Sequence, residues 1–568
     1  MRLVAALLAI FGIALAQQPA VEPATLVLRG GKIVTVDASM PEARAIAVRG
    51  DRIQALATTD DGIQRYIGPN TQVIDLKGRL AVPGLIESHG HFMGLGQSKM
   101  TLDLMDVKDW DDIVSMVAAA AKQATPGEWI LGRGWHQEKW ATVPKPNVEG
   151  FPFHDALSRV SPNNPVLLTH ASGHASFVNA KAMELANITA ATTNPSGGEI
   201  LKDSNGRPIG LLRETASGLA GRALDAWRAK KTPEERDADA RRQIELAVKA
   251  ALEAGVTTFQ DAGSNFATID LFKQAAATGR LPIRLWVMVR DSNENLRAKL
   301  AQYKAVGLNE NHLTIAAIKV IADGALGSRG AWMLEPYADS PSSVGLPTTS
   351  IESIAETARI ALDNGVQLCT HCIGDRANRE VLNVYERAYK SRPDLSDLRW
   401  RIEHAQHISA QDIPRFGQLG VIAAMQGIHA TSDAPYVLAR LGPKRAEEGA
   451  YVWQKLMKTG AIVANGTDVP VERIDPMANF YATVTRKTKD GSVFFGDQKM
   501  SRAEALKSYT WNGAYAAKEE ALKGSLAPGK LADITVLSKD IMTVAEDQIA
   551  STVAVYTIVG GKVAFSRQ

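Results

Sequence analysis

"LDNGVQLCTHCIG", residues 362–374, decides the fold because it joins the end of a helix to the start of a buried strand. An amphipathic stretch ends at Gly365, a residue suited to a helix C-cap, and an apolar run then leads to His371. An apolar run without alternation is typical of a parallel strand that is covered on both faces. The stretch therefore predicts one unit of a βα repeat.

The same order of helix, glycine and strand recurs along the middle of the chain. It is found in "ALEAGVTTFQDAG" (251–263), "GQLGVIAAMQG" (417–427) and "MKTGAIVANGTD" (457–468). Four further runs have strand character: "LIESHGH" (85–91), "IRLWVMVR" (283–290), "AAIKVIADG" (316–324) and "WRIEHAQ" (400–406). Eight βα units favour a closed (β/α)8 barrel of the α/β class, the TIM barrel, with a doubly wound open sheet as the alternative.

The segments around the barrel follow different patterns. Short alternating β patterns with glycine turns fill residues 17–82 and 517–568, which predicts one small β-sandwich domain built from both ends of the chain. The barrel then occupies 83–516. About 160 residues separate its first two strands, too many for a loop, so we expect an inserted lid subdomain after strand 1 at about 100–240.

Composition limits the class of partner. The chain has 568 residues, 45% of them hydrophobic, which is enough for a large core and a further domain. Lysine and arginine total 64 against 61 acidic residues, a net charge of +3 with no long run of one sign. We therefore expect a small-molecule substrate and no nucleic acid, while a homo-oligomer is left open.

The first twenty residues, "MRLVAALLAIFGIALAQQPA", have the pattern of a secretory signal peptide. Arg2 precedes an apolar stretch that is short for a membrane span, and small residues precede Gln17. We expect residues 1–16 to be removed and the protein to be periplasmic or secreted without a stable membrane anchor, an uncleaved anchor being the alternative. With only Cys369 and Cys372 in the chain, disulfides do not build the fold.

Polar residues gather where the barrel strands end. In a barrel these carboxyl ends form one rim, which carries the chemistry. The candidates are His89 and His91 on strand 1, Lys319 on strand 4, His371 on strand 5, His404 on strand 6 and Asp468 on strand 8. Neutral imidazoles with a carboxylate suit zinc or a similar divalent ion, although any one of these histidines taken alone has a structural explanation.

Several stretches resemble motifs of one family. They are "GRGW" (132–135), "SGHASFVN" (172–179), "KVIADGALGSRGAWM" (319–333), "HCIGD" (371–375), "RIEHAQ" (401–406) and "GTDVP" (466–470). With His-X-His on strand 1, their order resembles the amidohydrolase superfamily and its YtcJ-like branch, amidohydrolase family 3, which includes N-substituted formamide deformylases. The resemblance runs from about Thr25 to the C-terminus.

This resemblance implies a binuclear metal centre. His89, His91 and Asp468 would bind one divalent ion and His371 and His404 a second, with a carboxylated Lys319 bridging both. Carboxylation has a physical reason, because an ammonium has no lone pair and would repel cations, whereas a carbamate offers anionic oxygens. Two zinc ions are expected, with manganese or iron as alternatives; an unmodified Lys319 would instead suit a single-metal site.

The implied reaction is hydrolysis of an amide-type, non-peptide carbon–nitrogen bond by a metal-activated hydroxide, with Asp468 as the catalytic proton acceptor. The alternatives are a lactonase or phosphotriesterase on the same site and a catalytically dead secreted binding protein. Cys369 and Cys372 form a C-x-x-C pair that is better explained by packing than by redox chemistry or a zinc knuckle.

Four residues are candidate substrate contacts: Arg133, Trp135 and His174 in the insertion, and Arg329 after strand 4. Each also has a structural explanation, such as packing of the lid or an internal ion pair. Trp129, Trp135 and Trp140 in the lid favour an apolar or aromatic leaving group.

Overall fold

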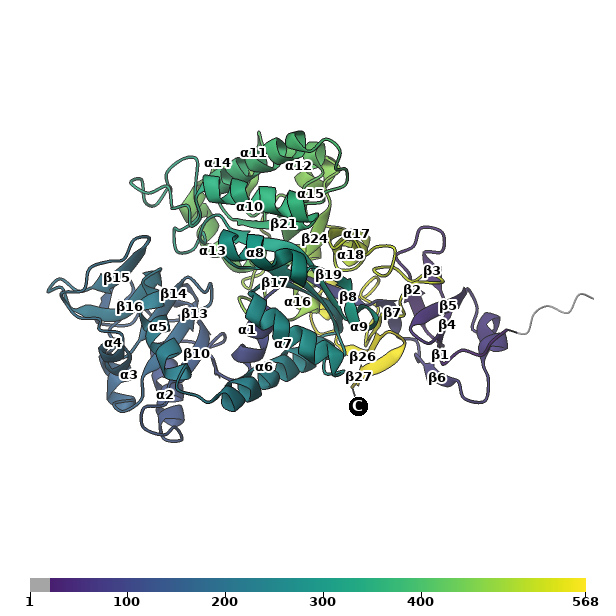
Figure 1. The fold of residues 1–568 in the computed structure, drawn as a ribbon, viewed down its shortest axis with the longest axis horizontal. Coiled ribbons are helices and arrows are strands. Elements are labelled where there is room, and N and C mark those ends of the chain that lie inside the picture. Colours follow the sequence, from purple (N-terminus) through teal and green to yellow (C-terminus); the bar gives the residue numbers. More distant parts are fainter. Residues whose placement is uncertain (1–20, 568) are drawn as a thin grey trace, which may run out of the picture.

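Eight parallel strands form the centre of the computed structural model, which describes residues 21–567. In order around the sheet they are β8 (Leu85–Gly90), β17 (Val256–Ser264), β18 (Arg284–Val289), β20 (Leu313–Ile321), β21 (Gln367–Cys372), β22 (Arg401–His404), β23 (Ile422–Met425) and β24 (Val463–Asn465). The first and last strands meet just beyond β24, where the Asp468 amide donates to the His89 carbonyl at 2.8 Å. The predicted barrel is confirmed, and its strands are the eight predicted ones (Figure 1).

The closing seam depends on a glycine. A Cβ at Gly466 would lie 2.6 Å from the His89 amide nitrogen, so only glycine lets the segment after β24 approach β8 this closely. The four glycines predicted to end helices also behave as expected: Gly255, Gly365, Gly420 and Gly460 have φ of 85°, 59°, 64° and 86°. They follow α6 (Pro233–Glu253), α10 (Ile351–Asn364), α12 (Ile413–Leu419) and α15 (Trp453–Lys458).

Both ends of the described chain form a β domain beside the barrel. One sheet has the order β5 (Arg52–Ala57), β4 (Ala45–Arg49), β1 (Leu26–Arg29), β6 (Gln72–Asp75). The other has the order β27 (Lys562–Ser566), β26 (Ala554–Val559), β25 (Ile534–Leu537), β7 (Leu80–Pro83), β2 (Lys32–Val34), β3 (Glu42–Ala43). Apolar side chains from both sheets share one core.

The insertion after strand 1 has its own sheet. Its order is β15 (Gly198–Lys202), β16 (Pro208–Glu214), β14 (Ala175–Val178), β13 (Val166–His170), β10 (Ile130–Trp135), β9 (Leu102–Asp103). Helices α2 (Trp110–Ala121), α3 (Asp155–Val160), α4 (Ala180–Leu185) and α5 (Ser217–Arg228) accompany it. Figure 1 shows the insertion and the β domain on opposite sides of the barrel. Residue 240, the expected end of the insertion, falls inside α6, which packs with the barrel core.

No helix in residues 21–567 has the length and apolar character needed to cross a membrane. The expected signal peptide, 1–16, lies outside the described residues.

A buried ion pair joins the barrel to the β domain. Arg284 of β18 donates from Nε and Nη2 to the two oxygens of Asp533, at 2.7 and 2.9 Å. We expect Arg284→Met to lower the free energy of unfolding by about 3 to 5 kcal/mol, because it leaves a buried carboxylate without its cation. Urea unfolding measures this change. In the control, Arg392→Met removes an exposed arginine paired with Asp394 and should leave the unfolding midpoint unchanged; equal effects would contradict the prediction.

Candidate functional site

The six predicted metal ligands converge on the barrel rim. His89 lies near the end of β8 and His91 directly before α1 (Phe92–Ser98), while Lys319, His371 and His404 lie in β20, β21 and β22. Ring centroids are 4.6 Å apart for His89 and His404, 4.5 Å for His371 and His404, and 5.8 Å for His89 and His91. All six are buried except His91, which is partly exposed.

Asp468 faces two sets of imidazoles. Its Oδ1 lies 3.2 Å from His91 Nε2 and 3.5 Å from His89 Nε2, and its Oδ2 lies 4.0 Å from Nε2 of His429. The residue has a φ of 56°, an unusual conformation that clusters at functional sites. Although burial opposes ionisation, the neighbouring imidazoles hold the pKa of Asp468 well below its usual range. The carboxylate is therefore ionised at neutral pH.

The arrangement of donor atoms fits a divalent cation. Within residues 21–567, the Nε2 atoms of His89, His371 and His429 are buried and have no hydrogen-bond partner. In the part of the chain that the structure describes, two groups have ligand atoms within 4.8 Å of one another: His89, His91 and Asp468; and His404, His429 and Asp468. Buried imidazole nitrogens and a carboxylate at these distances are the ligand set that zinc and similar ions prefer.

Lys319 lies among these groups as a buried side chain. Burial lowers its pKa, although the Glu403 and Asp468 carboxylates oppose the change. Burial and the charge of Lys319 together lower the pKa of His89 to about 4, which keeps that imidazole neutral at physiological pH. A neutral imidazole is the form that binds a metal.

A second layer of polar residues orients the imidazoles. Glu403 makes a short hydrogen bond with Nδ1 of His89 and accepts from Arg401 Nε at 2.7 Å. His404 Nδ1 contacts the Gln426 side-chain oxygen at 2.8 Å. When Nδ1 donates to an oxygen, Nε2 keeps its lone pair, so these contacts select the tautomer that can bind a cation. Glu403 is not among the residues predicted from the sequence, although it directly precedes His404 in "RIEHAQ".

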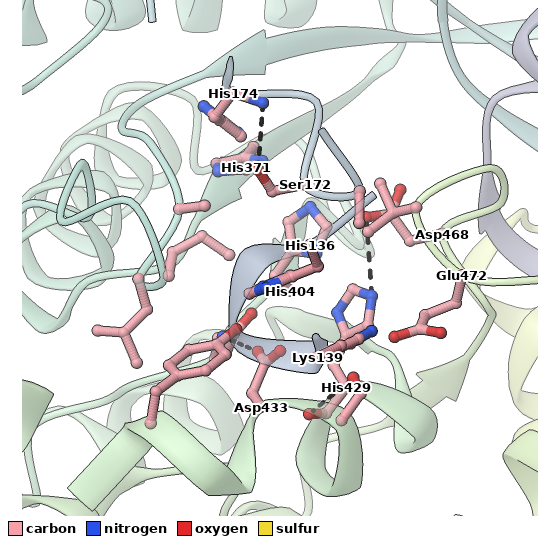
Figure 2. A pocket seen from close by; sticks show the side chains of 18 residues that line it. His136, Lys139, Ser172, His174, His371, His404, His429, Asp433, Asp468 and Glu472 are labelled. Carbon is pink, nitrogen blue, oxygen red and sulfur yellow. Dashed lines mark hydrogen bonds and ion pairs between the residues drawn. The ribbon is translucent and has the colours of Figure 1, made fainter. Parts of the chain in front are cut away.

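A solvent-open cavity of about 620 Å³ leads to this rim (Figure 2). The insertion contributes His136, Lys139, Ser172 and His174 to its wall, and the barrel contributes Leu326, His371, His404, His429, Asp433, Tyr436, Asp468 and Glu472. The insertion thus covers one side of the opening, as a lid would.

Of the four predicted substrate contacts, only His174 lines this cavity. Its Nδ1 lies 2.8 Å from Glu214 Oε2, and Glu214 also accepts from Ser328 in the loop after β20. The lid histidine is therefore held by a carboxylate that connects the insertion to the barrel.

The other three predicted contacts do not line this cavity. Arg133 donates to the carbonyls of Pro470 and Ala171, Trp135 is buried in the core of the insertion, and Arg329 pairs with Asp339. Trp129 and Trp140 also pack within the insertion rather than on the cavity wall, so they give no support for an aromatic leaving group. Cys369 and Cys372 are buried free thiols, in keeping with the packing interpretation.

One wall of the cavity was not foreseen from the sequence. His429, Asp433 and Tyr436 lie on α13 (Gly427–Leu441), directly after β23. Their spacing of four and three residues places them on one helix face. The sequence does contain a signal for this wall, because the three polar residues follow the end of a predicted strand at helical spacing.

Comparison with known proteins gives consistent matches. A model of the amidohydrolase family matches residues 72–565. The putative amidohydrolase YtcJ of Bacillus subtilis is 29% identical, covering 95% of this chain and 99% of the relative. The N-substituted formamide deformylase of Arthrobacter pascens is 27% identical, covering 95% and 98%. The crystal structure of an uncharacterized metal-dependent hydrolase from Pyrococcus furiosus is 25% identical, with a TM-score of 0.71, covering 91% and 100%.

Proposed function

The chain belongs to the amidohydrolase family and is a metal-dependent hydrolase, and we propose that it hydrolyses an amide-type, non-peptide carbon–nitrogen bond. The observation that carries the proposal is the convergence of buried imidazoles with Asp468 on one rim, where several imidazole nitrogens have no hydrogen-bond partner within residues 21–567. The deformylase relative acts, by its name, on N-substituted formamides, so formamides are the first substrates to test.

Each rim residue has a role in this proposal. His89, His91 and Asp468 would hold one divalent ion, and His371 and His404 a second. Lys319 would bridge the two as a carbamate, formed when its neutral amine adds to carbon dioxide and releases a proton. Zinc suits this donor set, with manganese or iron as alternatives.

The protein's own groups would complete the reaction. When bound, a divalent cation would supply a lowered pKa for water, from about 15.7 towards 7, and a charge facing the scissile carbonyl. Asp468 would accept the proton of the attacking water and return it to the leaving nitrogen. Within the cavity, His174 would contact the substrate, while Glu214 holds its ring in place.

The test is a measurement of metal and of bond specificity. Elemental mass spectrometry on protein purified without chelator should find about two equivalents of metal per chain. The same protein should hydrolyse formamides and other amides faster than lactones or organophosphates. One equivalent would indicate a mononuclear hydrolase, a preference for lactones or organophosphates would overturn the assigned bond, and a chain that binds no metal would favour a binding protein.

Glu403 should control metal affinity through His89. We expect Glu403→Gln to weaken metal binding by about 10- to 100-fold, because the neutral amide no longer polarises the imidazole. Competition with a chromophoric chelator measures the affinity of the folded variant.

The matched control for this variant is Glu519→Gln. Glu519 is also buried, but it pairs with Lys523 and bonds to Thr314 at the start of β20, the strand end opposite the rim. Unchanged metal affinity in Glu403→Gln, or an equal loss in both variants, would contradict a specific role for Glu403.

A further inference from the structure

One face of α13 runs along the cavity and presents a carboxylate to it. His429 begins this face, with Nε2 at 4.0 Å from Asp468 Oδ2. Asp433 follows one helical turn later, about 6 Å along the axis. Tyr436 comes next, and its ring stacks on His136 of the insertion, 6.2 Å between centroids. A ligand whose reacting group lies at Asp468 would therefore extend past Asp433 (Figure 2).

Asp433 is held in place by neutral donors. Its Oδ2 accepts a short hydrogen bond from the Tyr451 hydroxyl and one of 3.1 Å from Gln406 Nε2, and the Tyr436 hydroxyl also bonds to it. Within residues 21–567, Asp433 forms no ion pair with a lysine or arginine. Arg440, on the same helix, pairs with Asp339 instead.

Burial makes the ionised form of the Asp433 carboxylate unfavourable unless a cation pairs with it. Burial raises the pKa of Asp433, and the charge of Glu472, which lines the same cavity, acts in the same direction. His429 and the hydroxyls of Tyr436 and Tyr451 oppose this change without reversing it. Its neighbour His429 is more than nine-tenths buried, and its Nε2 has no hydrogen-bond partner among the described residues. A largely buried charge is stabilised by a paired ion, and here the open cavity is where such an ion can enter.

We propose that Asp433 binds a cationic nitrogen of the substrate, so that the preferred substrates are amides that carry a protonated amine a few bonds from the scissile bond. The bond that is cleaved rests on the proposed function, whereas the cation site rests on Asp433 and its surroundings in the cavity. Lys139 also lines the cavity and would favour the opposite charge, but its side chain is exposed.

Three formamides of similar length test the proposal. N-formylputrescine carries an ammonium, N-formylpentylamine replaces it with a methyl group, and N-formyl-γ-aminobutyrate carries a carboxylate. The wild-type kcat/KM should be at least about tenfold higher for the ammonium compound than for the methyl compound, as expected for one charged hydrogen bond. A preference for the methyl or the carboxylate compound would overturn the proposal.

Two variants assign the preference to this residue. Asp433→Asn keeps the shape of the side chain and should abolish the preference for the ammonium compound while the rate on the methyl compound stays within a few-fold. Asp433→Glu keeps the charge and should therefore retain part of the preference for the ammonium compound. An equal loss on both compounds in Asp433→Asn would show that Asp433 only shapes the cavity, and would overturn the proposal.

A binding measurement separates this proposal from the assigned reaction. If wild-type protein cleaves none of the three formamides, the proposed bond class fails. Calorimetric titration with n-butylammonium chloride then still tests the cation site. Binding by wild-type protein that is lost in Asp433→Asn supports the site, and absent or equal binding in the two proteins overturns it.

Discussion

Asp468→Asn should lower kcat on the order of 10³-fold, the size of effect expected when a general base is removed. The amide has nearly the shape of the carboxylate but does not accept a proton from water. Its oxygen can still face His89 and His91, so part of the bound metal should remain. Steady-state kinetics on a formamide, together with metal content measured on the same preparation, test both expectations.

Asp412→Asn is the matched control for this variant. Asp412 is also a buried aspartate, but it pairs with Arg379 and Arg415 at the start of α12 and not with the rim. This change should reduce stability and leave kcat within a few-fold. If Asp468→Asn keeps near-normal kcat, Asp468 has no part in proton transfer; if its kcat loss simply follows complete loss of metal, its role is ligation.

Lys319→Met should remove at least one equivalent of metal and lower kcat by about 10³-fold, since the cation supplies several kcal/mol to the transition state. Methionine fills a similar volume without charge, and burial already disfavours the charged form of Lys319. The fold should therefore persist while the bridging ligand is lost. Elemental analysis and kinetics measure the two effects.

Lys523→Met separates this effect from the general cost of replacing a buried lysine. Lys523 pairs with Glu519 at 2.6 Å and does not touch the rim, so its variant should keep its metal. A carbamate on wild-type Lys319 should add 44 Da to the mass of the intact protein under native conditions. Two equivalents of metal in Lys319→Met would contradict the bridging role.

Much of the fold could be predicted because its signals are local. Gly255, Gly365, Gly420 and Gly460 mark helix ends through their own backbone conformation, and the apolar runs after them need no knowledge of distant residues. The closure of the barrel between its first and last strands was harder to predict. It depends on the contact of Gly466 with His89, which are far apart in the sequence, and no periodic pattern encodes that distance.

Substrate-facing residues were harder to predict than metal ligands for the same reason. Arg133, Trp135 and Arg329 are residue types that commonly bind ligands, yet each found a partner inside the protein. The packing of the insertion against the barrel decides which of its side chains face the cavity. Of the candidate contacts named from the sequence, only His174 lies on the cavity wall, and Asp433 could be placed there only once both surfaces were known.

The amino-acid sequence alone determined the barrel and the residues of its rim, because parallel strands in a barrel bring their carboxyl ends to one edge. These rim residues are His89, His91, Lys319, His371, His404 and Asp468. Only the three-dimensional structure shows that Glu403 hydrogen-bonds to His89 and that α13 forms the far wall of the cavity. It also shows that Asp323 Oδ1 lies 3.7 Å from His371 Nε2. These contacts join elements tens to hundreds of residues apart. Their geometry comes from the shapes of the packed surfaces, which local sequence patterns do not specify.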